Sequence, residues 1–305
     1  MKTTVSAGVV ALPRSRFADF VILTKPRVAI LVLFTVAAGA MLAGRPELPL
    51  LLHALVGTAL VAAGASALNQ LLERHSDALM LRTENRPLPA GRMQPVEVLV
   101  FGMTLGLGGL IYLALLVRQP LTVLVAGVTF VSYVLLYTPL KRKTTLNTLV
   151  GAIPGALPPV IGWTAVSGSI NEQAFALFLI IFLWQVPHFL AISWIFREDY
   201  ARAGYCMLAV VDERGAMIGR QMVSYCLALI PVSLAPVLWQ SAGLFYALGA
   251  LALGLGFLWS AVGFMQCTSK VQARRVLHAS LVYLPLLLAL LLGENLVGAL
   301  AFAVP

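Results

Sequence analysis

The chain alternates long apolar blocks with short polar segments almost from end to end. Nine blocks stand out, at residues 26–44, 50–72, 96–117, 121–138, 146–166, 174–196, 218–239, 243–264 and 276–302. A helix needs about 20 predominantly apolar residues to cross the hydrocarbon core of a bilayer. The pattern therefore predicts an all-α integral membrane protein with nine transmembrane helices. We expect one multispan domain over residues 20–302, preceded by a tail of residues 1–19.

The composition agrees with a membrane protein and excludes several other classes. Of the 305 residues, 60% are hydrophobic and only 11% are charged, and the mean hydropathy is +0.92, whereas soluble domains carry about 25% charged residues. The three cysteines, Cys206, Cys226 and Cys267, are scattered and form no CxxC pair. Neither a disulfide scaffold nor a zinc site is indicated.

The net charge of +9 has a topological explanation. So basic a soluble protein would suggest a nucleic-acid partner. Here 19 of the 21 Lys and Arg residues fall in the tail and in alternate connections, and only Arg45 and Arg118 lie on the other side. Because cytoplasmic loops are enriched in Lys and Arg, we expect a cytoplasmic N-terminus, a surrounding lipid bilayer and no nucleic-acid partner.

An acidic motif marks the cytoplasmic end of the second block. Nine of the 12 acidic residues lie on the cytoplasmic side, and Asn69, Glu73 and Asp77 follow one another at intervals of four. If the helix continues through Asp77, all three share one face. Oxygen ligands of this kind suit Mg²⁺, which commonly bridges protein carboxylates and substrate phosphates. The alternative is a solvated helix end that carries surface ion pairs.

A second acidic pair, Glu198 and Asp199, follows the sixth block. His188 precedes Asp199 by eleven residues, close to three helical turns, so a continuous helix would carry both on one face. Acidic sites after the second and the sixth block suggest two four-helix repeats plus one further helix. If the two sites face one cavity, they supply a metal cluster that neither has alone.

Basic residues accompany the acidic ones. Arg82, Arg86 and Arg92 follow the first motif, and Lys141 and Arg142 follow the fourth block. Acidic residues with basic residues nearby suit a metal ion together with a diphosphate. Each basic cluster by itself is also typical of an anchor that only orients the helices.

Together these residues resemble a known family. The motif Asn69-x₃-Glu73-x₃-Asp77 is similar to the first aspartate-rich motif of the UbiA superfamily of intramembrane prenyltransferases. Within it, the run from Asn69 to Arg92 and the stretches 137–142, 154–163 and 184–208 resemble the heme O synthase branch. The resemblance covers roughly residues 20–300. Two positions depart from the superfamily pattern, because Glu73 stands in place of an aspartate and the second site is reduced to Glu198-Asp199.

The resemblance implies a UbiA-type bundle that transfers the farnesyl group of farnesyl diphosphate to a vinyl group of heme b. Heme b is then a substrate, and the product is heme O for terminal oxidases. The implied Mg²⁺ ligands are Asn69, Glu73, Asp77 and Asp199, with Glu198 as a further catalytic residue. The implied diphosphate ligands are Arg82, Arg86, Arg92, Lys141 and Arg142.

The acceptor side rests on His188, an imidazole within a predicted span. It is either a heme contact, as the resemblance implies, or a histidine packed and hydrogen-bonded in the bundle. The branch also implies the bacterial inner membrane, with heme A synthase or oxidase assembly proteins as partners. Two other functions stay open: prenylation of an aromatic acceptor such as 4-hydroxybenzoate, and non-catalytic transport of heme or lipid.

Overall fold

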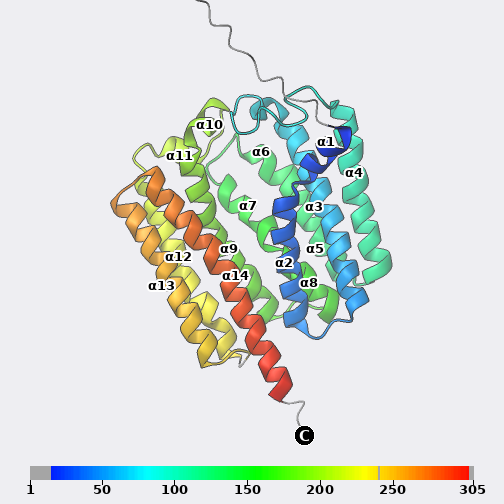
Figure 1. Ribbon diagram of the computed structural model, residues 1–305, viewed down its shortest axis with the longest axis vertical. Coiled ribbons are helices and arrows are strands. Elements are labelled where there is room, and N and C mark those ends of the chain that lie inside the picture. Colours follow the sequence, from blue (N-terminus) through cyan, green and yellow to red (C-terminus); the bar gives the residue numbers. More distant parts are fainter. Residues whose placement is uncertain (1–14, 240, 302–305) are drawn as a thin grey trace, which may run out of the picture.

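The computed structural model describes residues 15–239 and 241–301, and its regular elements over these residues are all helices (Figure 1). They are α1 (Arg16–Thr24), α2 (Pro26–Ala43), α3 (Leu48–Asp77), α4 (Pro95–Tyr112), the π-helical η1 (Leu113–Val117), α5 (Pro120–Val131), the π-helical η2 (Ser132–Tyr137), α6 (Thr138–Leu140), α7 (Asn147–Ala156), α8 (Pro158–Ser167), α9 (Glu172–Ile195), α10 (Arg197–Arg202), α11 (Leu208–Val211), α12 (Ala216–Leu238), α13 (Leu244–Gln266) and α14 (Lys270–Ala301). Most of the predicted tail, residues 1–14, and residue 302 lie outside the described residues.

Nine helical segments of the described chain are long and apolar enough to cross a membrane, which confirms the predicted number. They run over Pro26–Ala43, Leu48–Asp77, Pro95–Val117, Pro120–Leu140, Asn147–Ser167, Glu172–Ile195, Ala216–Leu238, Leu244–Gln266 and Lys270–Leu296. The last begins earlier than predicted. Its first turns carry Arg274 and Arg275, which lower the local hydropathy without interrupting the helix. The protein is therefore an integral, multi-pass membrane protein.

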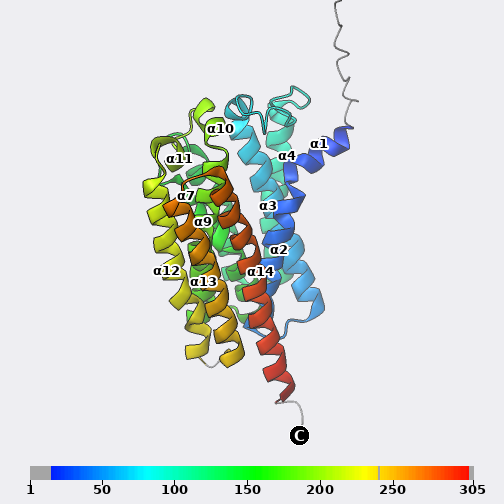
Figure 2. The ribbon, with the colours of Figure 1, turned by 60° about the vertical axis from the view of Figure 1, so that its left-hand side comes forward.

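The helices pack around two main hydrophobic clusters. One joins α3, α5 and α8 through side chains such as Val61, Phe130 and Ile161. The other joins α9, α12, α13 and α14 and includes Tyr246 and Tyr283. Figures 1 and 2 show α2, α3 and α4 on one side of the molecule and α12 and α13 on the other. Helix α7 contributes Ala152 and Ala156 to the second cluster and packs beside α9. The two predicted four-helix repeats stay a prediction.

Two glycines bring α2 and α8 into backbone contact. A Cβ at Gly162 would lie 1.9 Å from the carbonyl oxygen of Val36, and a Cβ at Gly39 would lie 2.0 Å from that of Pro159. Small residues at helix interfaces let backbones approach closely in membranes. The position of α2 is therefore fixed by backbone contact, and with it the position of the residues at its start.

The short helices gather at one end of the bundle, which we call the loop end. It contains α1, α6, α10, α11 and the segment 78–94 (Figure 1). Helix α1 was not predicted. It begins where the hydroxyl of Ser15 accepts a hydrogen bond from the Ala18 amide at 3.2 Å, and it ends at Lys25, whose backbone is left-handed with φ of 49°.

Candidate functional site

The acidic motif occupies the last turns of α3 at the loop end. Asn69, Glu73 and Asp77 are all buried, with exposed fractions of 1%, 6% and 0%. The helix does continue through Asp77, so the spacing of four places the three side chains on one face, as predicted. The interpretation as a solvated helix end is wrong, because all three side chains are buried.

Each of these side chains contacts a cation from another segment. Lys141 Nζ lies 2.6 Å from Glu73 Oε1, and Arg86 Nη1 lies 2.7 Å from Asp77 Oδ2. Burial lowers the pKa of Lys141, but the carboxylate of Glu73 and the nearby hydroxyls of Tyr137, Tyr133 and Tyr205 together raise it well above its ordinary value. Buried charges persist only when they are paired and hydrogen-bonded. The motif is therefore held by its own counter-ions.

Lys25 is a third cation at this cluster, although it is not among the predicted site residues. Its Nζ donates to Asn69 Oδ1 at 2.9 Å, while Asn69 Nδ2 donates to Thr138 Oγ1 at 3.1 Å. Burial, and next the nearby charge of Arg86, lower the pKa of Lys25 to about 7. The signal in the sequence was a lysine directly before Pro26, where a helix must begin anew.

Arg142 adds a fourth cation near the cluster. Its Nε donates to Ser76 Oγ at 3.1 Å, and its Nη2 donates to the same oxygen. Ser76 precedes Asp77 on α3 and is fully buried. Four basic side chains thus surround two carboxylates, so the cluster carries surplus positive charge that suits an anionic ligand such as diphosphate.

The second acidic pair does not continue α9 as expected. The helix ends at Ile195, and Phe196, with φ of −106° and ψ of 22°, interrupts it before α10 begins. The prediction that His188 and Asp199 lie on one face of a continuous helix is therefore wrong. Asp199 is buried and pairs with Arg202 of the same short helix.

Glu198 lies outside the cluster. Its side chain is 74% exposed and accepts a hydrogen bond from Lys270 Nζ at 2.9 Å. That hydrogen bond holds the pKa of Glu198 below its ordinary value. Exposed pairs of this kind contribute little to stability, so the contact marks the surface beside α14.

The segment after α10 nevertheless packs against the first site. The Cys206 amide donates to the Lys141 carbonyl at 2.8 Å, and the Tyr205 ring centroid lies 6.0 Å from Lys141 Nζ. The Tyr205 hydroxyl is buried without a hydrogen-bond partner, and burial raises its pKa. Tyr205 is a further residue of the site that the sequence did not single out.

Arg82 connects the two loops. Its guanidinium lies 4.7 Å from the ring centroid of Phe196 and 5.3 Å from that of Tyr200, and it donates to the Tyr200 hydroxyl at 3.1 Å. Such cation–π contacts orient a guanidinium as well as stabilise it. The loops that follow α3 and α9 therefore meet at the loop end, and the prediction that both acidic sites face one cavity stays a prediction.

Arg92 has a different partner from the one expected. Its Nε lies 3.0 Å from Asp19 Oδ1 of α1, and its Nη2 donates to the Asn85 carbonyl. It bonds neither Glu73 nor Asp77. Asp19 is 1% exposed, so Arg92 anchors α1 to the segment 78–94, and its contact with a diphosphate stays a prediction.

The donor atoms of the acidic motif suit a hard cation. Asp77 Oδ1 is buried and lacks a hydrogen-bond partner, and Glu73 and Asn69 supply further oxygens within two turns of α3. Oxygen-only sets are typical of Mg²⁺ sites, which are completed by substrate phosphates. Within the described residues no three His, Cys, Asp or Glu side chains form a ready metal site, so the four-ligand set that includes Asp199 stays a prediction.

His188 lies within α9 and is half-buried. Its Nδ1 lies 2.8 Å from Ser280 Oγ of α14, and its ring stacks on that of Trp184 with centroids 4.8 Å apart. Seven residues separate it from the end of α9 at Ile195, about 10 Å along the helix axis. The imidazole therefore lies about two turns deeper than the end of α9.

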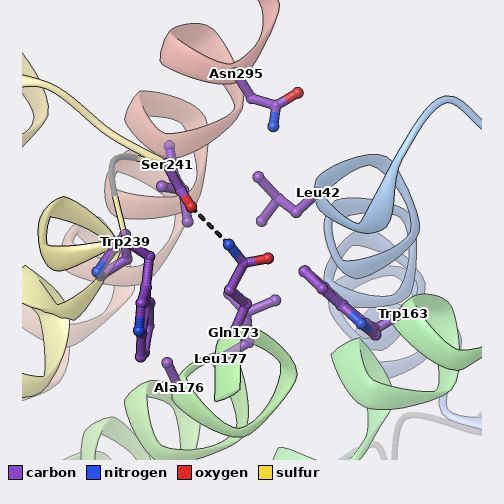
Figure 3. A pocket seen from close by; sticks show the side chains of 10 residues that line it. Leu42, Trp163, Gln173, Ala176, Leu177, Trp239, Ser241 and Asn295 are labelled. Atoms are coloured by element: carbon purple, nitrogen blue, oxygen red, sulfur yellow. Dashed lines mark hydrogen bonds between the residues drawn. The ribbon is translucent and has the colours of Figure 1, made fainter. Parts of the chain in front are cut away.

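A cavity of about 150 Å³ lies at the opposite end of the bundle (Figure 3). The described residues that line it are apolar or uncharged, and Gln173 Nε2 donates to Ser241 Oγ at 2.7 Å across it. Trp163 also lines it, and its buried indole Nε1 lacks a hydrogen-bond partner. This cavity lacks the cations that a diphosphate requires, so it is distinct from the acidic cluster.

Comparison with known proteins places the site in a family context. The model of the UbiA prenyltransferase family matches residues 32–290. The chain is 46% identical to a protoheme IX farnesyltransferase of Solibacter usitatus, over 91% of this chain and 98% of that one. It is also 46% identical to the protoheme IX farnesyltransferase of Myxococcus xanthus, over 90% and 93% of the two chains.

Solved structures show the same fold at low identity. A digeranylgeranylglyceryl phosphate synthase in membranes aligns with a TM-score of 0.77 at 15% identity, over 92% of this chain and 98% of that one. A UbiA homologue from Archaeoglobus fulgidus, bound to DMAPP and Mg²⁺, aligns with a TM-score of 0.69 at 15% identity, over 91% and 99%. The predicted all-α bundle of UbiA type is confirmed.

Proposed function

The chain belongs to the UbiA prenyltransferase family, and we propose that it transfers the farnesyl group of farnesyl diphosphate to a vinyl group of heme b. The product is heme O, and diphosphate is released. The observation that carries the proposal is the match to protoheme IX farnesyltransferases over about nine-tenths of both chains. The charged cluster at the loop end supplies chemistry that such a transfer requires.

Diphosphate binding can proceed by exchange of ion pairs. Arg86 and Lys141 are held by Asp77 and Glu73, so the cations are already positioned before a substrate arrives. An incoming diphosphate offers them phosphate oxygens. Its accompanying cation offers the carboxylates a new partner. Each buried charge thereby stays paired throughout, which avoids the cost of an isolated one.

The residues that would hold Mg²⁺ are Asn69, Glu73 and Asp77, with Asp199 as a fourth candidate. Support comes from the unpartnered Asp77 Oδ1 and from the Archaeoglobus fulgidus relative, which is described as bound to DMAPP and Mg²⁺. When bound, the ion supplies Lewis-acid stabilisation of the departing diphosphate. Arg86, Lys141 and Arg142 add fixed positive charge at the same place, and Lys25 adds a further charge when it is protonated.

The bonds that break and form during farnesyl transfer require that the helix bundle exclude water from the reacting carbons. The bond between the farnesyl C1 and the diphosphate oxygen breaks, and both electrons leave with the oxygen. The vinyl group donates its electron pair to C1, which forms the new carbon–carbon bond and a cation next to the porphyrin. Water captures that cation and loses a proton, which gives the hydroxyl. The apolar helices delay water until the carbon–carbon bond has formed.

We place the loop end on the cytoplasmic side of the bacterial inner membrane. The basis is the distribution of Lys and Arg, of which only Arg45 and Arg118 belong to connections at the opposite end. The positive-inside rule assigns such a basic face to the cytoplasm. Farnesyl diphosphate would then reach the cluster from the cytoplasm.

The test is a product assay with purified protein in lipid nanodiscs. Heme b, farnesyl diphosphate and Mg²⁺ are supplied, and the pigment is analysed by mass spectrometry. The proposal predicts that the mass of the heme increases by one farnesyl group and one hydroxyl group. In a parallel reaction, 4-hydroxybenzoate replaces heme b. Prenylated 4-hydroxybenzoate without modified heme would overturn the assignment of heme b as the acceptor. If neither acceptor is prenylated, the proposal that the protein is a prenyltransferase acting on these acceptors is overturned.

A further inference from the structure

We propose that Ser280 fixes His188 in the tautomer that carries its proton on Nδ1, so that the lone pair of Nε2 is free to bind the iron of the porphyrin substrate. The inference rests on the proposed function, since it assigns a protein ligand to the heme acceptor. It makes His188 an iron ligand and Ser280 its positioning residue.

The argument begins with the single proton of the Ser280 hydroxyl. Ser280 Oγ lies 2.7 Å from the carbonyl oxygen of Leu277, one turn earlier on α14, and 2.8 Å from His188 Nδ1. A carbonyl oxygen only accepts, so the hydroxyl proton must be donated to Leu277. Otherwise two oxygens would face each other at 2.7 Å with no proton between them.

The tautomer of His188 follows from that assignment. With its proton committed to Leu277, Ser280 Oγ can only accept from His188, so Nδ1 carries the hydrogen. In a neutral imidazole the other ring nitrogen is then unprotonated. His188 Nε2 therefore presents a lone pair, the form in which imidazole binds a metal.

Two further contacts hold the ring in place. Trp184, one turn earlier on α9, stacks on the imidazole at an interplanar angle of 25°. The Trp184 indole Nε1 donates to the backbone carbonyl of Ser280 at 2.8 Å. Ser280 thus contacts both aromatic residues, and the imidazole can neither turn over nor swing away without breaking its hydrogen bond to Ser280 and, for a swing, its stacking on Trp184.

The second ring nitrogen, Nε2, has no hydrogen-bond partner among the described residues, and the side chain of His188 is only half-buried. A metal-binding histidine typically donates its second ring N–H to a neighbouring oxygen, which orients the ring and raises its basicity as a ligand. His188 already has that arrangement.

The first experiment tests the tautomer in the protein without heme. Full-length protein in nanodiscs is labelled with ¹⁵N at its four histidines, and the His188 signals are identified by their loss in His188→Gln. We expect the shift pattern of a neutral ring protonated at Nδ1, and a move toward a mixture of tautomers in Ser280→Ala. Protonation at Nε2 in the wild type would overturn the inference.

The second experiment titrates ferric protoporphyrin IX into the same preparation without farnesyl diphosphate. Absorption and electron paramagnetic resonance should report a nitrogen ligand in the wild type and its loss in His188→Gly, with recovery when imidazole is added. Removing a residue that orients a metal ligand costs about 10- to 100-fold in metal affinity, so Ser280→Ala should weaken porphyrin binding by that factor.

Ser233→Ala is the matched control. Ser233 is also fully buried, and its hydroxyl donates to the carbonyls of Leu229 and Ile230 on α12. It should bind the porphyrin as the wild type does. Equal porphyrin affinity of Ser280→Ala and Ser233→Ala, or an unchanged iron spectrum in His188→Gly, would overturn the inference. A protein that shows the His188-dependent spectrum but forms no farnesylated heme would instead contradict the proposed function.

Discussion

Replacing Asp77 by Asn should make the protein bind diphosphate more tightly when no metal is present. In the structure Arg86 donates to Asp77 Oδ2 at 2.7 Å, and the Asp77 side chain is 1% exposed while that of Arg86 is 24% exposed. A diphosphate that arrives without Mg²⁺ must compete with this carboxylate for the guanidinium. Asparagine keeps the shape of the side chain and removes the competing charge.

The size of the effect follows from that geometry. Two unit charges 2.7 Å apart attract by about 6 kcal/mol at an effective dielectric constant near 20, and by about 1.5 kcal/mol in bulk water. Because desolvation offsets much of this attraction and Arg86 is partly exposed, we take about 1.5–3 kcal/mol as the net strength of a charged hydrogen bond. Since each 1.4 kcal/mol is tenfold in affinity, the gain is roughly 10- to 100-fold.

Two measurements on Asp77→Asn should change in opposite directions, the affinity for metal-free diphosphate upward and the rate of farnesyl transfer downward. Isothermal titration of inorganic diphosphate in EDTA should show tighter binding to Asp77→Asn than to the wild type. The farnesyl transfer rate in saturating Mg²⁺ should fall by more than 100-fold, since a candidate metal ligand has lost its charge. Arginine stays protonated at any pH used in the assay, so titration of Arg86 does not confuse the result.

Glu97→Gln is the control, because Glu97 pairs with Arg16 at the surface, where both side chains are at least one-third exposed. Removing its charge should change neither measurement. If Asp77→Asn binds metal-free diphosphate no more tightly than Glu97→Gln does, the exchange of ion pairs is refuted.

Three further outcomes are expected. Asp19→Ala should lower the free energy of unfolding by about 2 kcal/mol, as judged by thermal unfolding in micelles, because it leaves the partly exposed Arg92 without its buried partner; an unchanged melting temperature would contradict the anchoring of α1. Gly162→Ala should lower the free energy of unfolding by about 3 kcal/mol, because the added methyl group forces α2 away from α8. At Gly127 nothing lies within 4 Å, so Gly127→Ala should leave the free energy of unfolding unchanged or raise it by up to about 1 kcal/mol. Equal unfolding curves for the two variants would refute the close contact between α2 and α8. Chelation by EDTA should abolish farnesyl transfer and added Mg²⁺ should restore it, and a full rate in EDTA would show that the metal assignment is wrong.

The hydropathy pattern was sufficient for the membrane spans but not for the helices at the loop end. Long apolar blocks have one stable solution in a bilayer, so the nine spans follow directly from the sequence. Helix α1 was not predicted because its burial depends on contacts of Asp19 and Leu23 with other segments. The break at Phe196 was not predicted because no Pro or Gly marks it in the sequence.

The site shows the same division. Spacing within α3 identified Asn69, Glu73 and Asp77, because residues four apart on a helix share a face whatever surrounds them. The cations that pair with these three residues come from other segments of the chain. From the sequence alone, Arg92 and Lys141 were both predicted as diphosphate ligands, with nothing to distinguish them. Only the fold separates them, by placing Lys141 on Glu73 and Arg92 on Asp19.

The junction between α1 and α2 shields the site from changes in the membrane. Helix α1 exposes Phe17 and Val21, the kind of face that lies in the lipid headgroup region, and a bilayer of different thickness acts on such surface helices. Two contacts resist that pull, because Arg92 holds Asp19 of α1 and the glycine contacts with α8 fix α2. Lys25, which joins the two helices, should therefore keep its hydrogen bond to Asn69 when the lipid composition changes.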